Sequence, residues 1–174
     1  MKEDKLIPYI SKNKIEKAIE KLSEELNTQY KNNNVILVSI LKGSFIFTAD
    51  LVRKLDFNFV IDFVRLSSYQ NLKESMGTVT LSKDIESDIA GKHVLIVEEI
   101  LDSGLTLDFL MKRFCANSPL SVKICVLLDK KHKRKVPMQA DFVGIEIEDK
   151  FVVGYGLDFQ EKYRNLSEIY YLET

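Results

Sequence analysis

Three short runs of aliphatic residues constrain the fold of this chain more than any other feature of its sequence. Each is rich in Val, Ile or Leu and is apolar on both faces. The runs are Val35–Leu41, Val94–Val97 and Val122–Leu128. Strands of this kind need cover on both sides, which is typical of central strands in a parallel sheet. Apolar residues at helical spacing occur at 13–30, 45–55 and 105–114. The alternation predicts an α/β fold with a mainly parallel central sheet flanked by helices, which binds ligands at the carboxyl ends of its strands.

The length of 174 residues allows one domain with a small addition. Phe57–Leu66 predicts a further strand, and 142–147 and 151–155 predict two shorter ones. Between residues 67 and 88 the sequence is polar and lacks strong apolar periodicity. A stretch of this length inside a compact domain is more often functional than a simple connector. We therefore predict a single domain over residues 1–174, with a mobile lid loop at about 67–88.

The composition argues against several classes of function. A formal net charge of −1 gives no overall positive field, which disfavours non-specific binding to nucleic acid or to an anionic membrane. No apolar stretch approaches the ~18–20 residues that span a bilayer, and the charged Met1–Lys5 segment does not resemble a signal peptide. Cys115 and Cys125 lie in apolar surroundings, as expected of reduced thiols. We expect a cytoplasmic protein that binds neither nucleic acid nor membrane.

The segment after the second aliphatic run carries the clearest chemical signal. Glu98 and Glu99 stand where the predicted strand leaves the sheet, and burying adjacent carboxylates is costly unless cations or strong donors meet them. Asp102-Ser103-Gly104-Leu105-Thr106 then leads into a helix, where small and hydroxyl residues expose backbone N–H groups to an anion. Acids beside such a loop indicate one ligand with phosphate groups and with polyol or metal-bridged groups. The alternative is that the acids are exposed and Asp102 only caps the helix.

Other motifs are absent or weak. The GxGxxG fingerprint and the P-loop pattern do not occur, and Gly154-Tyr155-Gly156 has no third glycine. The two histidines, His93 and His132, offer no nucleophile–base pair. The basic run Lys130–Lys135, taken alone, is typical of a solvated face or, less often, of a nucleic-acid patch.

Residues Val94–Thr106 resemble the signature that binds phosphoribosyl pyrophosphate (PRPP) in type I phosphoribosyltransferases. Further segments follow the order seen in the hypoxanthine(-guanine) members of that family. They are Leu41-Lys42-Gly43-Ser44, Ser68-Tyr69, Lys130, Asp141-Phe142-Val143-Gly144, Phe151-Val152-Val153-Gly154-Tyr155 and Tyr163-Arg164-Asn165-Leu166. The resemblance runs from about Val35 to the C-terminus. Two positions depart from the family pattern: Glu99 stands where the signature more often has Asp, and Leu105 where some relatives carry Lys.

The resemblance implies the type I phosphoribosyltransferase fold, with a small hood at about 142–174 that binds the base. It implies a purine salvage enzyme that joins N9 of hypoxanthine, and of guanine, to ribose C1 of PRPP, giving IMP or GMP and pyrophosphate. It also implies Mg²⁺ as the cofactor, with Glu98, Glu99 and Asp158 at the metal, and a homodimer or homotetramer.

The resemblance assigns the PRPP and pyrophosphate contacts to a set of loop residues. They are Lys42, Gly43, Glu98, Glu99, Asp102, Ser103, Gly104, Leu105, Thr106 and Arg164. In that family the Leu41–Lys42 peptide is commonly cis. Ser68 and Tyr69, in the lid, would close over the pyrophosphate.

The base contacts are implied in the same way. Lys130 would donate to O6 of the purine and so exclude adenine, which presents an amino group there. Phe151 would stack on the ring, and Val152 would offer backbone groups to its edge. Asp158 would lie by the far side of the base or a second Mg²⁺. Asp102 is the implied catalytic base, which accepts the N7 proton.

Other functions stay open at this point. A xanthine-preferring phosphoribosyltransferase fits nearly the same residues, whereas an orotate or pyrimidine enzyme is disfavoured by Lys130 and Phe151-Val152. A regulator that keeps the phosphoribosyltransferase fold and binds nucleic acid would need a basic face, which the near-neutral charge disfavours.

Overall fold

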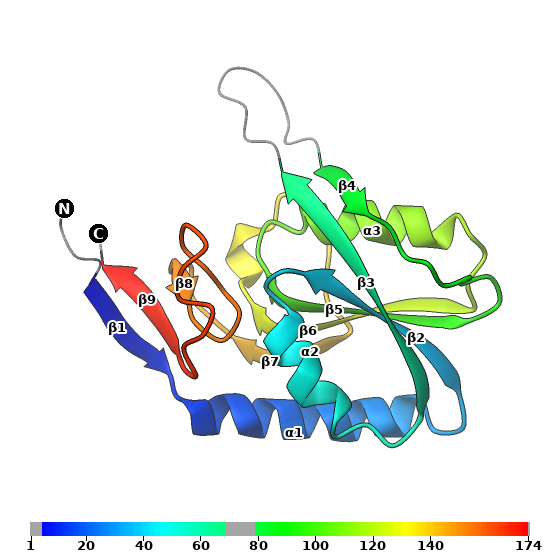
Figure 1. The fold of residues 1–174 in the computed structure, drawn as a ribbon, viewed down its shortest axis with the longest axis horizontal. Coiled ribbons are helices and arrows are strands. Elements are labelled where there is room, and N and C mark those ends of the chain that lie inside the picture. The colour runs from blue at the N-terminus through cyan, green and yellow to red at the C-terminus, as the bar shows by residue number, and fades with distance from the viewer. Residues whose placement is uncertain (1–4, 69–78, 174) are drawn as a thin grey trace.

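The computed structural model describes residues 5–68 and 79–173, and Figure 1 shows a twisted sheet with helices packed on it and a smaller sheet beside it. The larger sheet has the strand order β4-β3-β2-β5-β6-β7. Every neighbouring pair is parallel except β3 with β4. Its strands are β2 (Asn34–Leu41), β3 (Asn58–Ser68), β4 (Val79–Lys83), β5 (His93–Leu101), β6 (Ser121–Asp129) and β7 (Phe142–Glu146). The predicted α/β fold with a mainly parallel sheet is confirmed.

The aliphatic runs form the middle of this sheet because each of their faces meets different helices. Leu37 and Leu95, which are paired in register, pack in one apolar core with helices α1 and α2. Val38 and Ile96, the next pair along, point to the other face and pack in a second core with α3. The helices are α1 (Lys12–Gln29), α2 (Phe45–Val52), α3 (Leu105–Cys115) and the short 3₁₀ helix η1 (Lys131–Lys133). No helix in the described ranges is long and apolar enough to cross a membrane.

The smaller sheet joins the two ends of the chain. Its order is β1-β9-β8, formed by β1 (Lys5–Ile10), β9 (Ile169–Glu173) and β8 (Val152–Val153). Antiparallel pairing sets Lys5 opposite Glu173, and Figure 1 shows this sheet standing apart from the larger one. The expected hood at 142–174 therefore differs from what is observed: β7 pairs with β6 in the larger sheet, and the hood includes β1, which the sequence pattern did not indicate.

Of the segment expected to form a lid at 67–88, the structure describes residues 67–68 and 79–88. β3 continues through Ser68, and β4 returns antiparallel to it with Ser67 opposite Thr80. The chain after β4 is also held to β3, because the buried Asp62 carboxylate accepts hydrogen bonds from the backbone N–H groups of Glu86 and Ser87, both at 2.8 Å. Tyr69 and the rest of 69–78 lie outside the described residues.

Candidate active site

Glu98 and Glu99 lie within β5 rather than beyond its end. The strand continues because its pairing with β6 persists to Leu101, opposite Asp129. The Glu98 side chain is buried, and this burial raises its pKa well above the usual value; the neighbouring Glu99 carboxylate raises that pKa further. Oε2 of Glu99 is buried without a hydrogen-bond partner among the described residues. The two acids thus offer acceptor oxygens to a cation or to hydroxyl donors.

The loop after β5 leads directly into α3, where the sequence predicts an anion cradle. Gly104 is the N-cap of this helix, with φ of 83°, a left-handed conformation that favours glycine. Asp102 does not occupy the N-cap position, which belongs to Gly104, and the Leu105 N–H at the start of the helix donates to Ser103 Oγ at 3.5 Å. Ser103 and Thr106 line a cavity of about 280 Å³ together with Asp102, Gly104 and Glu98. Backbone N–H groups at the start of α3, with Leu105 as its first residue, are thereby placed next to the acids.

The turn that joins β2 to α2 packs between β5 and the C-terminal segment. Its Leu41–Lys42 peptide is cis, as the resemblance implied. A Cβ added to Gly43 would lie 1.8 Å from Oε1 of Glu99, so only glycine admits that carboxylate here. On the other side, a Cβ added to Gly156 would lie 2.0 Å from the Gly43 carbonyl oxygen. The sequence does not indicate this close approach, because it joins residues more than a hundred positions apart.

Buried hydroxyl groups of β2, the turn and α2 lie within hydrogen-bond distance of one another. Ser39, in β2, lies 2.7 Å from the Ser44 hydroxyl and 2.8 Å from that of Thr48, and all three side chains are buried. Ser44 also donates to the carbonyl oxygen of Ile40 at 2.6 Å. The buried hydroxyls therefore satisfy one another and fix the backbone that leads into Lys42 and Gly43.

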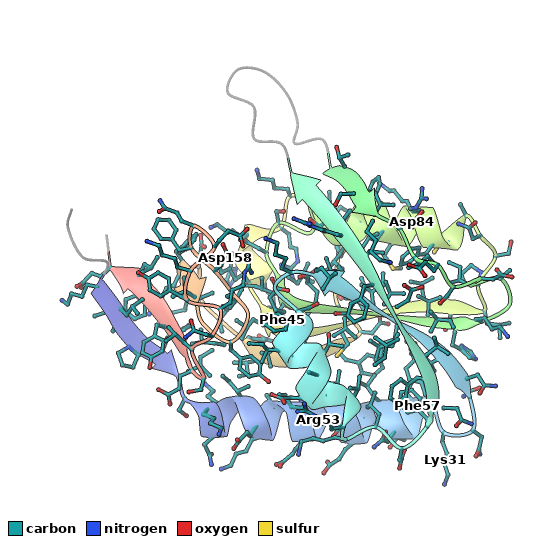
Figure 2. The ribbon with its side chains drawn as sticks, viewed as in Figure 1. Lys31, Phe45, Arg53, Phe57, Asp84 and Asp158 are labelled. Atoms are coloured by element: carbon teal, nitrogen blue, oxygen red, sulfur yellow. The ribbon has the colours of Figure 1, made fainter. Side chains whose placement is uncertain are left out.

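Two cations from distant segments share one carboxylate beside this turn. Lys42 Nζ lies 3.0 Å from Glu161 Oε2, and Arg164 Nη2 lies 3.2 Å from the same oxygen. Arg164 also pairs with Asp158 at 2.8 Å and donates to the Gly156 carbonyl oxygen at 2.8 Å. Figure 2 labels Asp158 on the loop after β8 and Phe45 at the start of α2, the two segments that meet here. Lys42 and Arg164 are thus brought together, as their expected common ligand requires.

Lys130 is the best-buried cation of the site. Its side chain is 5% exposed, and Nζ lies 3.7 Å from both Asp102 Oδ2 and Asp149 Oδ1. Phe151 is 53% exposed and makes an edge contact with Phe159, with ring centroids 5.6 Å apart. The ring face of an exposed aromatic is open to a planar ligand. Val152, by contrast, is buried in β8.

A sequence model of the phosphoribosyl transferase domain matches residues 10–160. The chain belongs to this family. The hypoxanthine-guanine phosphoribosyltransferase of Aquifex aeolicus is 44% identical over 170 residues, covering 97% of this chain and 96% of that protein. That of Bacillus subtilis is 43% identical over 169 residues, covering 97% and 94%. A crystal structure of a Bacillus anthracis hypoxanthine-guanine phosphoribosyltransferase is 40% identical, with a TM-score of 0.90 and 98% and 99% of the two chains covered.

The acids of this phosphoribosyltransferase site suit a divalent metal that keeps water and substrate ligands. Glu99 Oε2 and Asp102 Oδ1 are buried without a hydrogen-bond partner in the described ranges, and a cation would offset their buried negative charge. Asp158, the third expected ligand, is paired with Arg164 instead. No group of three His, Cys, Asp or Glu side chains suited to a metal occurs in the described ranges. Mg²⁺ usually takes one or two carboxylates and completes its shell with water and substrate phosphates, so the residues present fit it.

Two acids in this phosphoribosyltransferase were missed by sequence reasoning. Asp149 pairs with Lys133 at 2.7 Å as well as with Lys130, but in the sequence it is only part of a polar turn between strands. Glu161 bridges Lys42 and Arg164 and carries no local signal. Of the two expected lid residues, Ser68 is described by its backbone alone and Tyr69 lies outside the described residues, so their contact with pyrophosphate stays a prediction.

Proposed function

We propose that this chain transfers the 5-phosphoribosyl group of PRPP to N9 of hypoxanthine and of guanine, releasing pyrophosphate. The observation that carries the proposal is the placement of Lys130. Its buried ammonium group lies 3.7 Å from Asp102 Oδ2, next to the anion cradle. A hydrogen-bond donor beside a carboxylate matches the O6 acceptor and the N7 proton, which are adjacent on a 6-oxopurine. The relatives named above are hypoxanthine-guanine phosphoribosyltransferases, in agreement with this match.

Base selection follows from the burial of Lys130. The ammonium group has three donors and no acceptor, so it bonds a carbonyl oxygen but not the amino group of adenine. In a dry pocket a donor facing a donor is left unpaired, which costs far more than in water. The exposed face of Phe151 would stack on the ring, while the backbone at Val152 would meet its edge.

Asp102 is positioned to move the proton. Its Oδ1 is buried without a hydrogen-bond partner in the described part of the chain, so it can accept one. As N9 bonds to C1, the C1–O bond to pyrophosphate breaks and its electron pair leaves with the pyrophosphate. The N7 proton, made acidic by the electron-poor ring, passes to the Asp102 carboxylate.

Lys42 and Arg164 would bind the pyrophosphate. In the structure both contact the Glu161 carboxylate, which shows that one anionic group can reach both cations. The hydrogen bond from Lys42 and then that from Arg164 lower the pKa of Glu161. Mg²⁺, when bound near Glu98 and Glu99, would neutralise part of the charge on the leaving group. The loop Ser103–Thr106 would hold the 5′-phosphate through backbone N–H groups.

The test is a base panel with PRPP and Mg²⁺, in which nucleotide formation is read by absorbance. We expect turnover with hypoxanthine and guanine, and none with adenine or orotate. Lys130→Gln should lower kcat/KM for hypoxanthine by about ten- to a hundredfold, because a charged donor is lost. Lys131→Gln is the matched control, since Lys131 is exposed and pairs with Glu146 on the surface. If neither hypoxanthine nor guanine is converted, the proposed function is wrong. If Lys130→Gln keeps full activity, the proposed role of Lys130 is wrong.

The alternative of a nucleic-acid-binding regulator is disfavoured by the surroundings of the basic run. Lys130, Lys131, Lys133 and Arg134 all pair with carboxylates of the same chain. These internal partners neutralise the charge that a phosphate backbone would need.

We also propose that the chain works as a homodimer or homotetramer. Phe45 on α2 and Val60 and Ile61 on β3 are large apolar side chains that are 45%, 55% and 38% exposed. A second copy would bury them and gain roughly 25 cal/mol for each Å² of apolar surface removed from water. Sedimentation equilibrium should give a mass of at least two chains, and Val60→Lys should lower it. A monomer at micromolar concentration would contradict this expectation.

A further inference from the structure

Arg134, like Lys130 in the same basic run, has a largely buried side chain, at 14% exposure. Its Nη1 donates to the backbone carbonyl oxygens of Leu101 at 2.8 Å, Asp102 at 2.7 Å and Lys130 at 3.0 Å. Its Nη2 pairs with the buried carboxylate of Asp129. None of these contacts reaches a substrate position, so the roles proposed so far leave Arg134 unexplained.

The carbonyl groups that Arg134 binds come from two different loops. Leu101 is the last residue of β5 and Asp102 follows it, whereas Lys130 follows β6. Backbone bonds also join the two loops, from Lys130 N to Leu101 O at 3.0 Å and from Lys135 N to Ser103 O at 2.9 Å. The Arg134 guanidinium group thus lies where the loop of Asp102, the proposed proton acceptor, contacts the loop of Lys130, the proposed donor to O6.

We propose that Arg134 is a positioning residue that sets Asp102 and Lys130 at the spacing of N7 and O6 on one purine edge. The inference rests on the proposed function, because that function makes the spacing matter. Two of the three carbonyl groups belong to Asp102 and Lys130, the reacting residues themselves. A shift of either backbone therefore moves the side chain that reacts. A planar guanidinium with fixed donors can hold several acceptors in one geometry, whereas the single ammonium group of lysine cannot.

Two variants separate positioning from simple stabilisation. Arg134→Lys keeps the charge beside Asp129 but loses the fork that binds the carbonyl groups. Asp129→Asn loses the ion pair but leaves that fork in place. Positioning predicts that Arg134→Lys lowers kcat by about a hundredfold, because small misplacement of reacting groups is that costly, while KM for PRPP changes little. Asp129→Asn should lower the melting temperature yet keep kcat near the wild-type value.

The contrary outcomes are distinct. If Asp129→Asn lowers kcat as much as Arg134→Lys, or if Arg134→Lys lowers only the melting temperature, Arg134 is structural and the inference is wrong. A wild-type chain that is inactive with every base would overturn the proposed function and this inference with it. Lys131→Gln, in the same basic run, is the control for charge. If Arg134→Lys does not fold, the double variant Asp129→Asn/Arg134→Gln, which keeps polar atoms without buried charge, is judged by the same kcat criterion.

Discussion

Asp102 combines a buried oxygen that has no hydrogen-bond partner among residues 5–68 and 79–173 with a second oxygen 3.7 Å from the Lys130 ammonium group. Asp102→Asn keeps the shape of the side chain but cannot take up a proton. We expect turnover to fall by about 10²–10⁴-fold, the usual contribution of a positioned general base. The melting temperature should hardly change, because the residue caps no helix. Steady-state kinetics and thermal melts measured on the same preparation test this, and a near-normal turnover would contradict the assignment.

Gly156 shows how one missing Cβ permits the contact between the hood and the turn after β2. Its φ is +97°, and a Cβ would lie 2.0 Å from the carbonyl oxygen of Gly43. Gly156→Ala should therefore destabilise the chain and also raise KM for PRPP, because the Gly43 backbone must move. Gly91→Ala is the matched control: Gly91 has φ of +63° but no atom within 4 Å of the added Cβ. The control should lose about 1–2 kcal/mol of stability at unchanged KM. Equal KM values in both variants would contradict the proposed contact.

At the scale of elements, Asp62 ties the segment after β4 to β3. Burial by itself raises the pKa of Asp62, but hydrogen bonds from Ser87, Phe63 and Glu86 outweigh it and lower the pKa below its usual value. A lowered pKa in the folded chain contributes stability above the unfolded-state value of about 3.9, and this contribution is lost as the pH falls through the folded-state pKa.

Asp62→Asn should therefore lower the free energy of unfolding at pH 7 by about 1.5–3 kcal/mol, the range for hydrogen bonds to a charged group. The difference from wild type should begin to shrink as the pH falls below about 4, where the unfolded-state carboxylate binds a proton, and should be lost below the lower folded-state pKa. Urea titrations across this range measure both quantities. A difference that is independent of pH would show that the charge of Asp62 is not what holds the segment.

At the scale of the whole molecule, the site draws its residues from both sheets and from loops far apart in the chain, so its ligands should stabilise the fold. PRPP at a hundred times its Kd should add about 2.7 kcal/mol to the free energy of unfolding. For a chain of this length that corresponds to a rise in Tm of roughly 5–11 °C. Excess EDTA should remove most of the rise if Mg²⁺ joins the complex through Glu98 and Glu99. A PRPP-induced shift that survives EDTA unchanged would argue against a metal beside these acids.

The sequence by itself determined the central strands of the larger sheet and the loop that leads into α3. The strands β2, β5 and β6 were predictable because a strand that is buried on both faces consists of consecutive apolar residues. Helix α3 was predictable because its apolar residues recur at helical spacing. The position of the loop Asp102–Thr106 before a helix was predictable as well, because small and hydroxyl residues directly precede the apolar helical pattern; its role as an anion site stays a prediction. These patterns involve residues that are close together in the sequence, so they can be recognised without knowledge of the rest of the fold.

Only the tertiary structure decided which distant residues meet. The pairing of β1 with β9 joins the two ends of the chain. The packing of Glu99 against Gly43, and the shared contact of Lys42 and Arg164 with Glu161, likewise cross long stretches of sequence. Such contacts depend on where the sheet places the ends of its strands, and no short pattern of polar residues encodes that placement. The sequence therefore specified which groups could bind a phosphate and a base, while the fold set their spacing, and catalysis depends on that spacing.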